Sequence, residues 1–550
     1  MLLHGHQKQK GFFRFMAGLA QFARTFTTAR SERLRSILLG LLSVTALTAG
    51  TDIAHAQTTS SQPTNQATSQ NAVSEKSATI KNASAQPDVH IDSMSSSPVM
   101  RNLVAGFDQT QSQSSPTEPS RSKGDPGPYF SAPMGSQHFF GDWGGAQPWL
   151  LKHGIHLLAA INEEFAGNFT GGKEKAYSDS GQVGVEVDID WDKLAGVKNF
   201  WTHTLIVNGH GQSVSRNFGD SIAGVQEIYG ARGNVVAHMV AMYGEMAFLH
   251  NRIDVSAGWI PVGSFFAASP LFCDFMNVAM CGNPAPNKYT EGNRDWPSGN
   301  LGAIVRVMPT TDTYLMAGLF AVSPHAYNGG ISGWAWAQSG LGKFSTPVEF
   351  GWMPHFGKDQ LAGHYVIGYS YDNSRYPNLY EDIHGNSWQA TGLPRRYEAG
   401  RNSAWLLVDQ MLVRNGPGNT NGLIALAGAM YSDGKTVAMR DHEWVGMVDT
   451  GSAWGRPLDT IGAMYQHFDM SHTAALQQES SMALGLPFQD NQWGNVYGPQ
   501  SHENVWELFY SAHIARAMAL QPDFQYIQRP SATTTFHDAA VLGVQFTVVL

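Results

Sequence analysis

The chain has 550 residues, of which only 14% are charged and 11% are aromatic, and its formal net charge is −9. Soluble domains carry about a quarter charged residues, so this composition argues against an ordinary water-exposed surface. The acidic balance gives no basic footprint for nucleic acid, and the mean hydropathy of −0.23 excludes a protein built mainly of transmembrane helices.

The N-terminal region has the layout of a secretory signal peptide. Three arginines between residues 30 and 35 precede the apolar run ILLGLLSVTALTAG (37–50), and Ala54 and Ala56 form an A-x-A cleavage site. We therefore predict a signal peptide over 1–56 and export from the cytoplasm. Residues 57–125 are rich in Ser, Thr, Gln, Asn and Pro, which predicts a disordered polar linker. Residues 126–155 are expected to form an N-terminal periplasmic or plug segment.

The first clear strand signal is GQVGVEVDIDWD, residues 181–192. Its apolar side chains stand at odd positions and belong to Val183, Val185, Val187, Ile189 and Trp191. Its acidic side chains stand at even positions and belong to Glu186, Asp188 and Asp190. Because side chains alternate across a strand, the segment predicts a ribbon with one apolar and one acidic face. In a soluble protein the apolar face would meet a core, whereas in a membrane barrel it would meet lipid and the carboxylates would line a pore.

Similar alternation recurs along the rest of the chain and predicts about sixteen strands, an even number as bacterial outer-membrane barrels require. The predicted strands are residues 156–169, 182–191, 201–210, 235–249, 252–259, 301–308, 313–322, 347–352, 362–372, 403–413, 422–431, 443–449, 459–468, 503–514, 519–527 and 539–550. Alternate gaps are mostly long, as at 260–300, or short, as at 309–312, which matches long outer loops and short periplasmic turns. The sequence thus predicts an all-β fold, a transmembrane antiparallel β-barrel over 156–550.

Several motifs resemble those of one family of such barrels, the carbohydrate-selective porins of the OprB family. They are FFGDWGGAQPWLLKHGI (139–155), GWIPVGSFFAASPLFCDFMN (258–277), GRPLD (455–459), and LQPDFQYIQRPSA followed by AAVLGVQF near the end. The resemblance runs from about Phe139 to Leu550, and the long polar extension before it is not shared. It implies an outer-membrane barrel that passes sugars, notably glucose, by diffusion.

In such a barrel the apolar faces belong to lipid, because a charged side chain facing hydrocarbon is destabilising. The inward-pointing charges predicted by this parity are Glu164, Glu186, Asp188, Glu245, Arg252, Asp254, Arg306, Glu349, Asp409 and Glu507. Carboxylates and guanidinium groups form strong hydrogen bonds with hydroxyls. Our candidates for the sugar pathway on the wall are therefore Glu186, Asp188, Glu245, Arg252 and Arg306. The alternative is that most inward charges pair with one another and brace the wall.

The same parity makes two further predictions about aromatic and apolar side chains. In the strand 201–210 we expect Trp201, Leu205 and Val207 on the lipid side, opposite Thr202, Thr204 and Asn208. Aromatic side chains near strand ends suit the girdles at the two membrane interfaces, and Trp201, Trp259, Trp352, Tyr371 and Trp506 are candidates.

The loop 260–300 is the best candidate for a constriction. Arg294, Asp295 and Trp296 place a cation, an acid and a large ring within three residues, a suitable set for gripping a sugar. An ordinary surface loop with a solvated charge pair is the alternative. The same loop holds both cysteines, Cys273 and Cys281, which predict a local disulfide in an oxidising compartment, with two free thiols as the alternative.

The sequence therefore predicts a passive, carbohydrate-selective porin of the bacterial outer membrane that needs no cofactor and no metal, because no metal motif is present. The expected partners are mono- or oligosaccharides, outer-membrane lipid including lipopolysaccharide, the barrel assembly machinery and a possible homo-oligomer, with no nucleic acid. Three alternatives stay open: a non-selective porin, an outer-membrane barrel enzyme, and a soluble all-β binding protein. No nucleophile motif supports the enzyme, and the low charge argues against the soluble protein.

Overall fold

The computed structural model describes residues 138–226, 236–249, 251–281, 298–322, 334, 343–416, 419–488, 496–515 and 517–550. The signal peptide and linker predicted for 1–125 lie outside these residues, as do Arg294, Asp295 and Trp296. Among the described residues, no helix is long and apolar enough to cross a membrane.

The described chain is mostly strand. The strands are β1 (Ile155–Gly172), β2 (Tyr177–Asp190), β3 (Phe200–Gly211), β4 (His238–Phe248), β5 (Ile253–Ile260), β6 (Asn300–Thr310), β7 (Thr313–Ala321), β8 (Phe344–Ser345), β9 (Val348–Trp352), β10 (His355–Phe356), β11 (Leu361–Asp382), β12 (Arg395–Arg414), β13 (Gly422–Ser432), β14 (Met439–Thr450), β15 (Thr460–Met470), β16 (His502–Ala515), β17 (Met518–Gln528) and β18 (His537–Val549). Strands β8 and β9 form one wall strand that is interrupted at Pro347, which has no N–H to donate. Strand β10 extends the turn before β11, so the wall has sixteen strands, as predicted.

Short helices occupy the connections. The α-helices are α4 (Ala146–Lys152), α5 (Trp191–Ala195), α6 (Ser215–Phe218), α8 (Trp388–Thr391) and α9 (His472–Ala483). The 3₁₀ turns are η2 (Trp143–Gly145), η4 (Val262–Ser264), η5 (Phe272–Asp274), η6 (Gly451–Trp454) and η7 (Pro530–Ala532).

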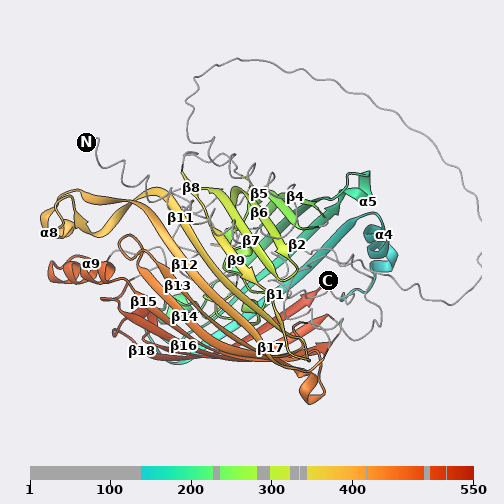
Figure 1. The fold of residues 1–550 in the computed structure, drawn as a ribbon. Coiled ribbons are helices and arrows are strands. Elements are labelled where there is room, and N and C mark those ends of the chain that lie inside the picture. Colours follow the sequence, from blue (N-terminus) through green and yellow to red (C-terminus); the bar gives the residue numbers. More distant parts are fainter. Residues whose placement is uncertain are drawn as a thin grey trace, which may run out of the picture. The chain divides into compact units, whose positions relative to one another are not determined.

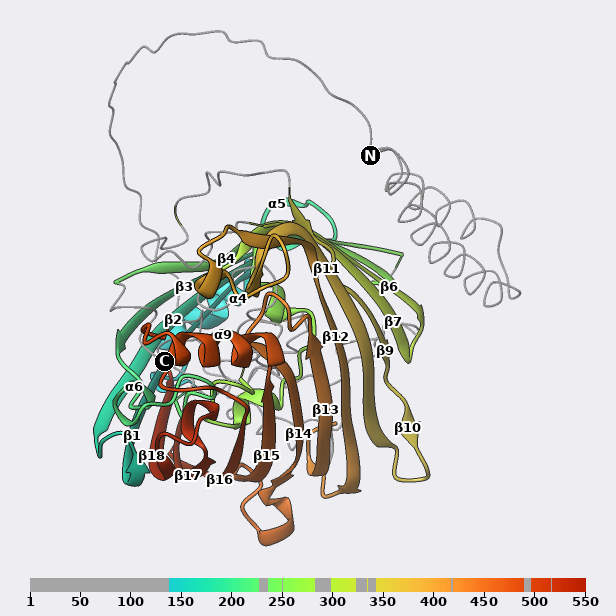
Figure 2. The ribbon, with the colours of Figure 1, turned by 90° about the vertical axis from the view of Figure 1, so that its left-hand side faces the viewer.

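The sheet closes on itself. Neighbouring strands pair antiparallel in chain order, and β1 pairs with both β2 and β18, with Ala160 opposite Val549 at the seam. The strands run steeply across the barrel in Figure 1, and Figure 2 looks along it from the end that carries α8 and α9. This arrangement confirms the predicted closed antiparallel β-barrel.

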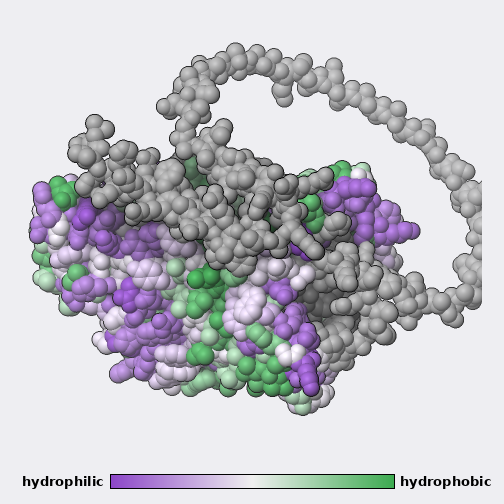
Figure 3. Space-filling view, in the orientation of Figure 1, coloured by the Kyte–Doolittle hydropathy of each residue, from purple (hydrophilic) through white to green (hydrophobic). Residues whose placement is uncertain are grey.

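The two faces of the wall differ as the alternation predicts. In β2, Val185 is exposed on the outer face, whereas Glu186 and Asp188 are buried on the inner face. Figure 3 shows hydrophobic residues gathered across the middle of one side of the wall, with hydrophilic ones toward the end that carries α8 and α9. Trp352 and Trp506 are also exposed on the wall, as expected of girdle side chains.

The segment after β5 lies inside the ring of strands, where Figure 2 shows it in green. Phe266, Phe272 and Phe275 from this segment are fully buried and belong to one apolar cluster with wall side chains of β3, β12 and β16. Ring contacts join Phe272 to Trp444 and Phe275 to Phe509, at centroid distances of 5.8 and 5.1 Å. We call residues 261–281 the inserted loop. Its packing makes part of the inner face apolar.

The inserted loop explains one of two predictions that were wrong. In β3, Leu205 and Val207 point inward and are buried in the apolar cluster, while Thr202 and Thr204 are on the outer face. The second is Trp259, which is buried rather than in a girdle and follows Gly258, whose φ is 148°. A third difference is that β11 and β12 continue through most of the expected loop 373–402.

Candidate functional site

Two carboxylates of the wall hold the inserted loop in place. The Ala267 amide donates a 2.8 Å hydrogen bond to Oε2 of Glu349, which also accepts from Trp405 Nε1 at 2.8 Å. On the other side of the barrel, Oε1 of Glu507 accepts the amides of Met276 and Asn277, the latter at 3.2 Å. These two inward carboxylates therefore connect the wall to the loop.

The inserted loop also closes on itself covalently, because Cys273 and Cys281 form a disulfide. Asn277, between them, donates from Nδ2 to Gln525 Oε1 on β17 at 2.9 Å. Hydrogen bonds to three wall strands and a local cross-link therefore fix a loop within the lumen.

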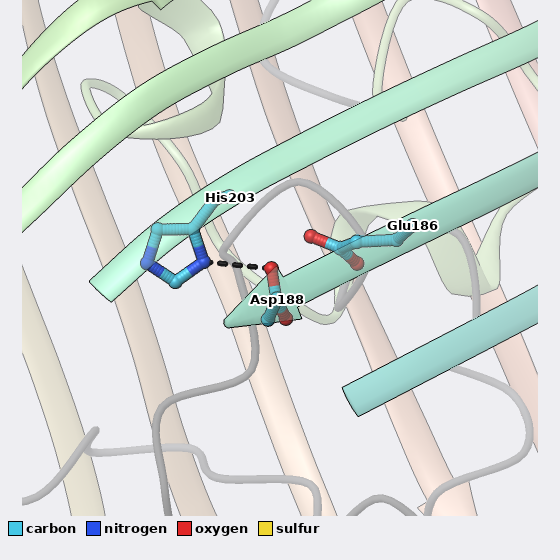
Figure 4. Close-up of side chains that lie close together, drawn as sticks. All are labelled: Glu186, Asp188 and His203. Atoms are coloured by element: carbon cyan, nitrogen blue, oxygen red, sulfur yellow. Dashed lines mark hydrogen bonds and ion pairs between the residues drawn. The ribbon is translucent and has the colours of Figure 1, made fainter. Parts of the chain in front are cut away.

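A second group of inward charges lies on β2 and β3. Strand register places Asp188 opposite His203, and Nδ1 of the histidine is 2.8 Å from Oδ1 of Asp188. Glu186 is two residues from Asp188 on the same strand and face, so all three side chains point into the same space (Figure 4). Their ligand atoms lie within 4.8 Å of one another, and all three residues are buried.

The group continues across the next three strands. Nε2 of His203 is 3.3 Å from Oε2 of Glu245 on β4. Arg306 on β6 donates to Oδ2 of Asp254 on β5, and also interacts electrostatically with Glu245. The Arg306 side chain is 40% exposed. We call Glu186, Asp188, His203, Glu245, Asp254 and Arg306 the lumen cluster.

An aromatic ring accompanies the lumen cluster. Tyr243, inward on β4, stacks on His203 with a centroid distance of 4.7 Å and an interplanar angle of 24°. Tyr243 also contacts Phe265 of the inserted loop, at a centroid distance of 5.8 Å. The lumen cluster and the inserted loop thus border one another.

The structure brings together four of the five wall residues that the sequence singled out: Glu186, Asp188, Glu245 and Arg306. Arg252 is placed elsewhere, because β5 begins after it and its Nη1 donates to the Pro309 carbonyl at the turn. Arg294, Asp295 and Trp296 lie outside the described residues.

Sequence reasoning missed His203 and Tyr243. The sequence gives His203 no role because the inward and outward faces of β3 were predicted the wrong way round. Its nearness to Asp188 also depends on the register between β2 and β3, which the sequence alone does not show. His203 lies on the same face of β3 as Leu205 and Val207. Taking these two residues as interior rather than lipid-facing would have placed His203 inside the barrel.

A closed wall with an apolar outer face, an inner face that carries charged and polar side chains, and a loop folded into the lumen defines an outer-membrane porin. Comparison with known proteins gives the family. Residues 174–550 match the model of the family described as "Carbohydrate-selective porin, OprB family". The chain therefore belongs to the OprB family of carbohydrate-selective porins, and it is an outer-membrane protein.

Two relatives support this membership. Porin B of Pseudomonas aeruginosa is 27% identical over 425 residues, covering 75% of this chain and 91% of that protein. The structure titled "High pH structure of Pseudomonas putida OprB" is 25% identical with a TM-score of 0.69, covering 75% of this chain and 98% of that one. The sugar-selective porin predicted from the sequence is confirmed at the level of the family.

Proposed function

We propose that glucose-like sugars diffuse through this barrel past the lumen cluster, with no covalent chemistry and no energy coupling. The observation that carries the proposal is the position of Arg306. Its side chain is partly exposed on the inner face, and its guanidinium group is held by Asp254 beside Glu245. A fixed cation next to carboxylates offers both donors and acceptors to neighbouring hydroxyls of a sugar.

The rest of the route is proposed from chemistry and sequence. Tyr243 supplies a ring beside the cluster, and the Arg294–Trp296 segment stays a candidate for the same pathway. We also propose that residues 1–56 direct export and that residues 57–125 link them to the barrel. Because the outer face is apolar, we propose that the barrel contacts outer-membrane lipid and lipopolysaccharide and is inserted by the barrel assembly machinery. We also propose that copies of the barrel associate with one another.

Liposome swelling tests the sugar route. We expect faster entry of glucose than of a disaccharide or of a neutral polyethylene glycol of glucose-like size. Arg306→Ala removes the guanidinium donors and should bring the glucose-to-glycol ratio toward one. Arg396→Ala is the matched control, because this arginine pairs with Glu381 outside the lumen cluster, on the β11–β12 hairpin.

Equal entry of glucose and the glycol in the unmodified protein would leave a non-selective pore. A selective pore that Arg306→Ala leaves unchanged would place the sugar contacts elsewhere. Hydrolysis of a sugar or ester during transport would revive the enzyme alternative.

A further inference from the structure

We propose that Glu186, Asp188 and His203 bind one divalent transition-metal ion, for which Zn²⁺ fits best. This inference does not depend on the proposed sugar route. Within the described residues, no other group of three His, Cys, Asp or Glu side chains brings its ligand atoms so close together. All three are buried on the inner face of two adjacent strands.

The donor set suits the ion. Imidazole nitrogens and carboxylate oxygens are both zinc ligands, and sites with three protein ligands leave a fourth position for water. Tetrahedral Zn²⁺ with ligand distances of about 2.0–2.2 Å needs donor atoms roughly 3.3–3.6 Å apart. Asp188 and His203 are now in direct contact at 2.8 Å, so a small opening of this pair would admit the ion. Glu186 reaches it with a small side-chain movement, because the three ligand atoms span at most 4.8 Å.

The second nitrogen of the imidazole provides an independent argument. Metal-bound histidines almost always donate their other ring N–H to a carboxylate or carbonyl, which fixes the ring and raises its basicity. In His203, Nε2 lies 3.3 Å from Oε2 of Glu245, within reach of such a contact, while Nδ1 lies 2.8 Å from Asp188. Arg306 in turn interacts electrostatically with Glu245. The carboxylate that would orient the ligand is therefore present and itself supported.

Another buried histidine of the barrel shows the contrast. His364 lies 3.3 Å from Asp409 through Nδ1, but its Nε2 meets the Tyr314 hydroxyl rather than a carboxylate. It thus offers one carboxylate and one imidazole, which is too few protein ligands for the same ion. This difference makes His364 a matched control.

The test uses the folded barrel in detergent, stripped of metal with a chelator and titrated with Zn²⁺ in a calorimeter. We expect one Zn²⁺ per chain that is lost in His203→Gln and retained in His364→Gln. Glu186→Gln keeps the side-chain size and should also weaken binding. Glu245→Gln, which removes only the orienting carboxylate, should weaken it about 10–100-fold. Co²⁺ in place of Zn²⁺ should give a visible absorption spectrum of tetrahedral type that His203→Gln abolishes.

Circular dichroism and the heat-dependent gel shift verify that each variant is folded. If His203→Gln does not fold, Glu186→Gln decides the matter. The proposal is overturned if the unmodified protein takes up no stoichiometric Zn²⁺, or if the folded variants bind it as tightly.

Discussion

Glu349 is the side chain whose removal should most clearly release the inserted loop. Its carboxylate accepts three hydrogen bonds, from the Ala267 amide at 2.8 Å, Trp405 Nε1 at 2.8 Å and the Tyr314 hydroxyl at 2.7 Å. Glu349→Ala leaves these donors buried. A buried unsatisfied donor costs about 1–3 kcal/mol. The Tyr314 hydroxyl has a second partner in His364, at 3.3 Å, so two orphaned donors remain.

The expected cost is therefore about 2–6 kcal/mol, most of which is relieved when the loop leaves the wall. Even about 2 kcal/mol corresponds to a roughly 30-fold rise in the equilibrium constant for opening, since about 1.4 kcal/mol is a factor of ten. Hydrogen exchange followed by mass spectrometry on peptides covering 261–281 measures this rise. Glu349→Gln keeps one acceptor oxygen and should exchange more like the unmodified protein.

The control for general damage is Glu398→Ala, since Glu398 pairs with Arg396 on the exposed hairpin. This variant should leave exchange in 261–281 unchanged. Unaltered protection of the loop in Glu349→Ala would show that the wall carboxylate does not hold the loop, and the reasoning about bracing charges would fail.

Three further predictions concern the loop and a turn. Phe275→Ala removes a fully buried ring that packs on Phe509, which should lower the free energy of unfolding by about 3–5 kcal/mol in a urea titration; Phe165→Ala, on the exposed outer face, should change it far less. Replacing Cys273 and Cys281 by serine opens a short cross-linked loop, and the chain-entropy relation gives a loss of about 2–3 kcal/mol, which a reducing agent should reproduce in the unmodified protein but not in the variant. Burial opposes the ionisation of Asp459, in the turn before β15, but hydrogen bonds from Arg456, Tyr510 and the His513 amide outweigh it and lower the pKa of Asp459 below its ordinary value. Ionised Asp459 therefore stabilises the folded protein fully above the ordinary pKa of an aspartate, and this stabilisation is lost as the pH falls through the lowered pKa. Asp459→Asn should make the free energy of unfolding depend less on pH on the acid side. An unchanged pH dependence would contradict this role of Asp459.

The strands could be predicted because one face of the wall meets lipid and the other meets the lumen, so apolar and polar residues alternate along each strand. Where the two faces do not differ in this way, the strand was not predicted. Residues 373–382 and 395–402 form the outer parts of β11 and β12, and their outer face carries polar side chains such as Asn373, Arg375 and Arg396 instead of apolar ones. Because neither face of this hairpin is apolar, its sequence does not show the apolar–polar alternation that predicts a transmembrane strand.

The lumen cluster was predictable only in part. Glu186, Asp188, Glu245 and Arg306 follow from parity, because each stands on the polar face of its own strand. Partnership between strands does not follow from parity. Asp188 meets His203 because the β2–β3 register places them opposite one another, and that register depends on α5 and the turn that follows it. The inversion of β3 has a different cause, since the apolar inserted loop gives Leu205 and Val207 an interior partner.

The seam between β1 and β18 has a consequence for biogenesis. Ala160 finds its partner only when Val549 has arrived, so the opening strand keeps one unsatisfied edge while nearly the whole polypeptide is delivered. A row of bare amides and carbonyls of this length invites pairing with other molecules, and contacts so distant along the chain form slowly. The free edge of β1 must therefore be shielded in newly made chains until β17 and β18 are present. A mutation that disrupts β18 should cause aggregation before it changes permeability.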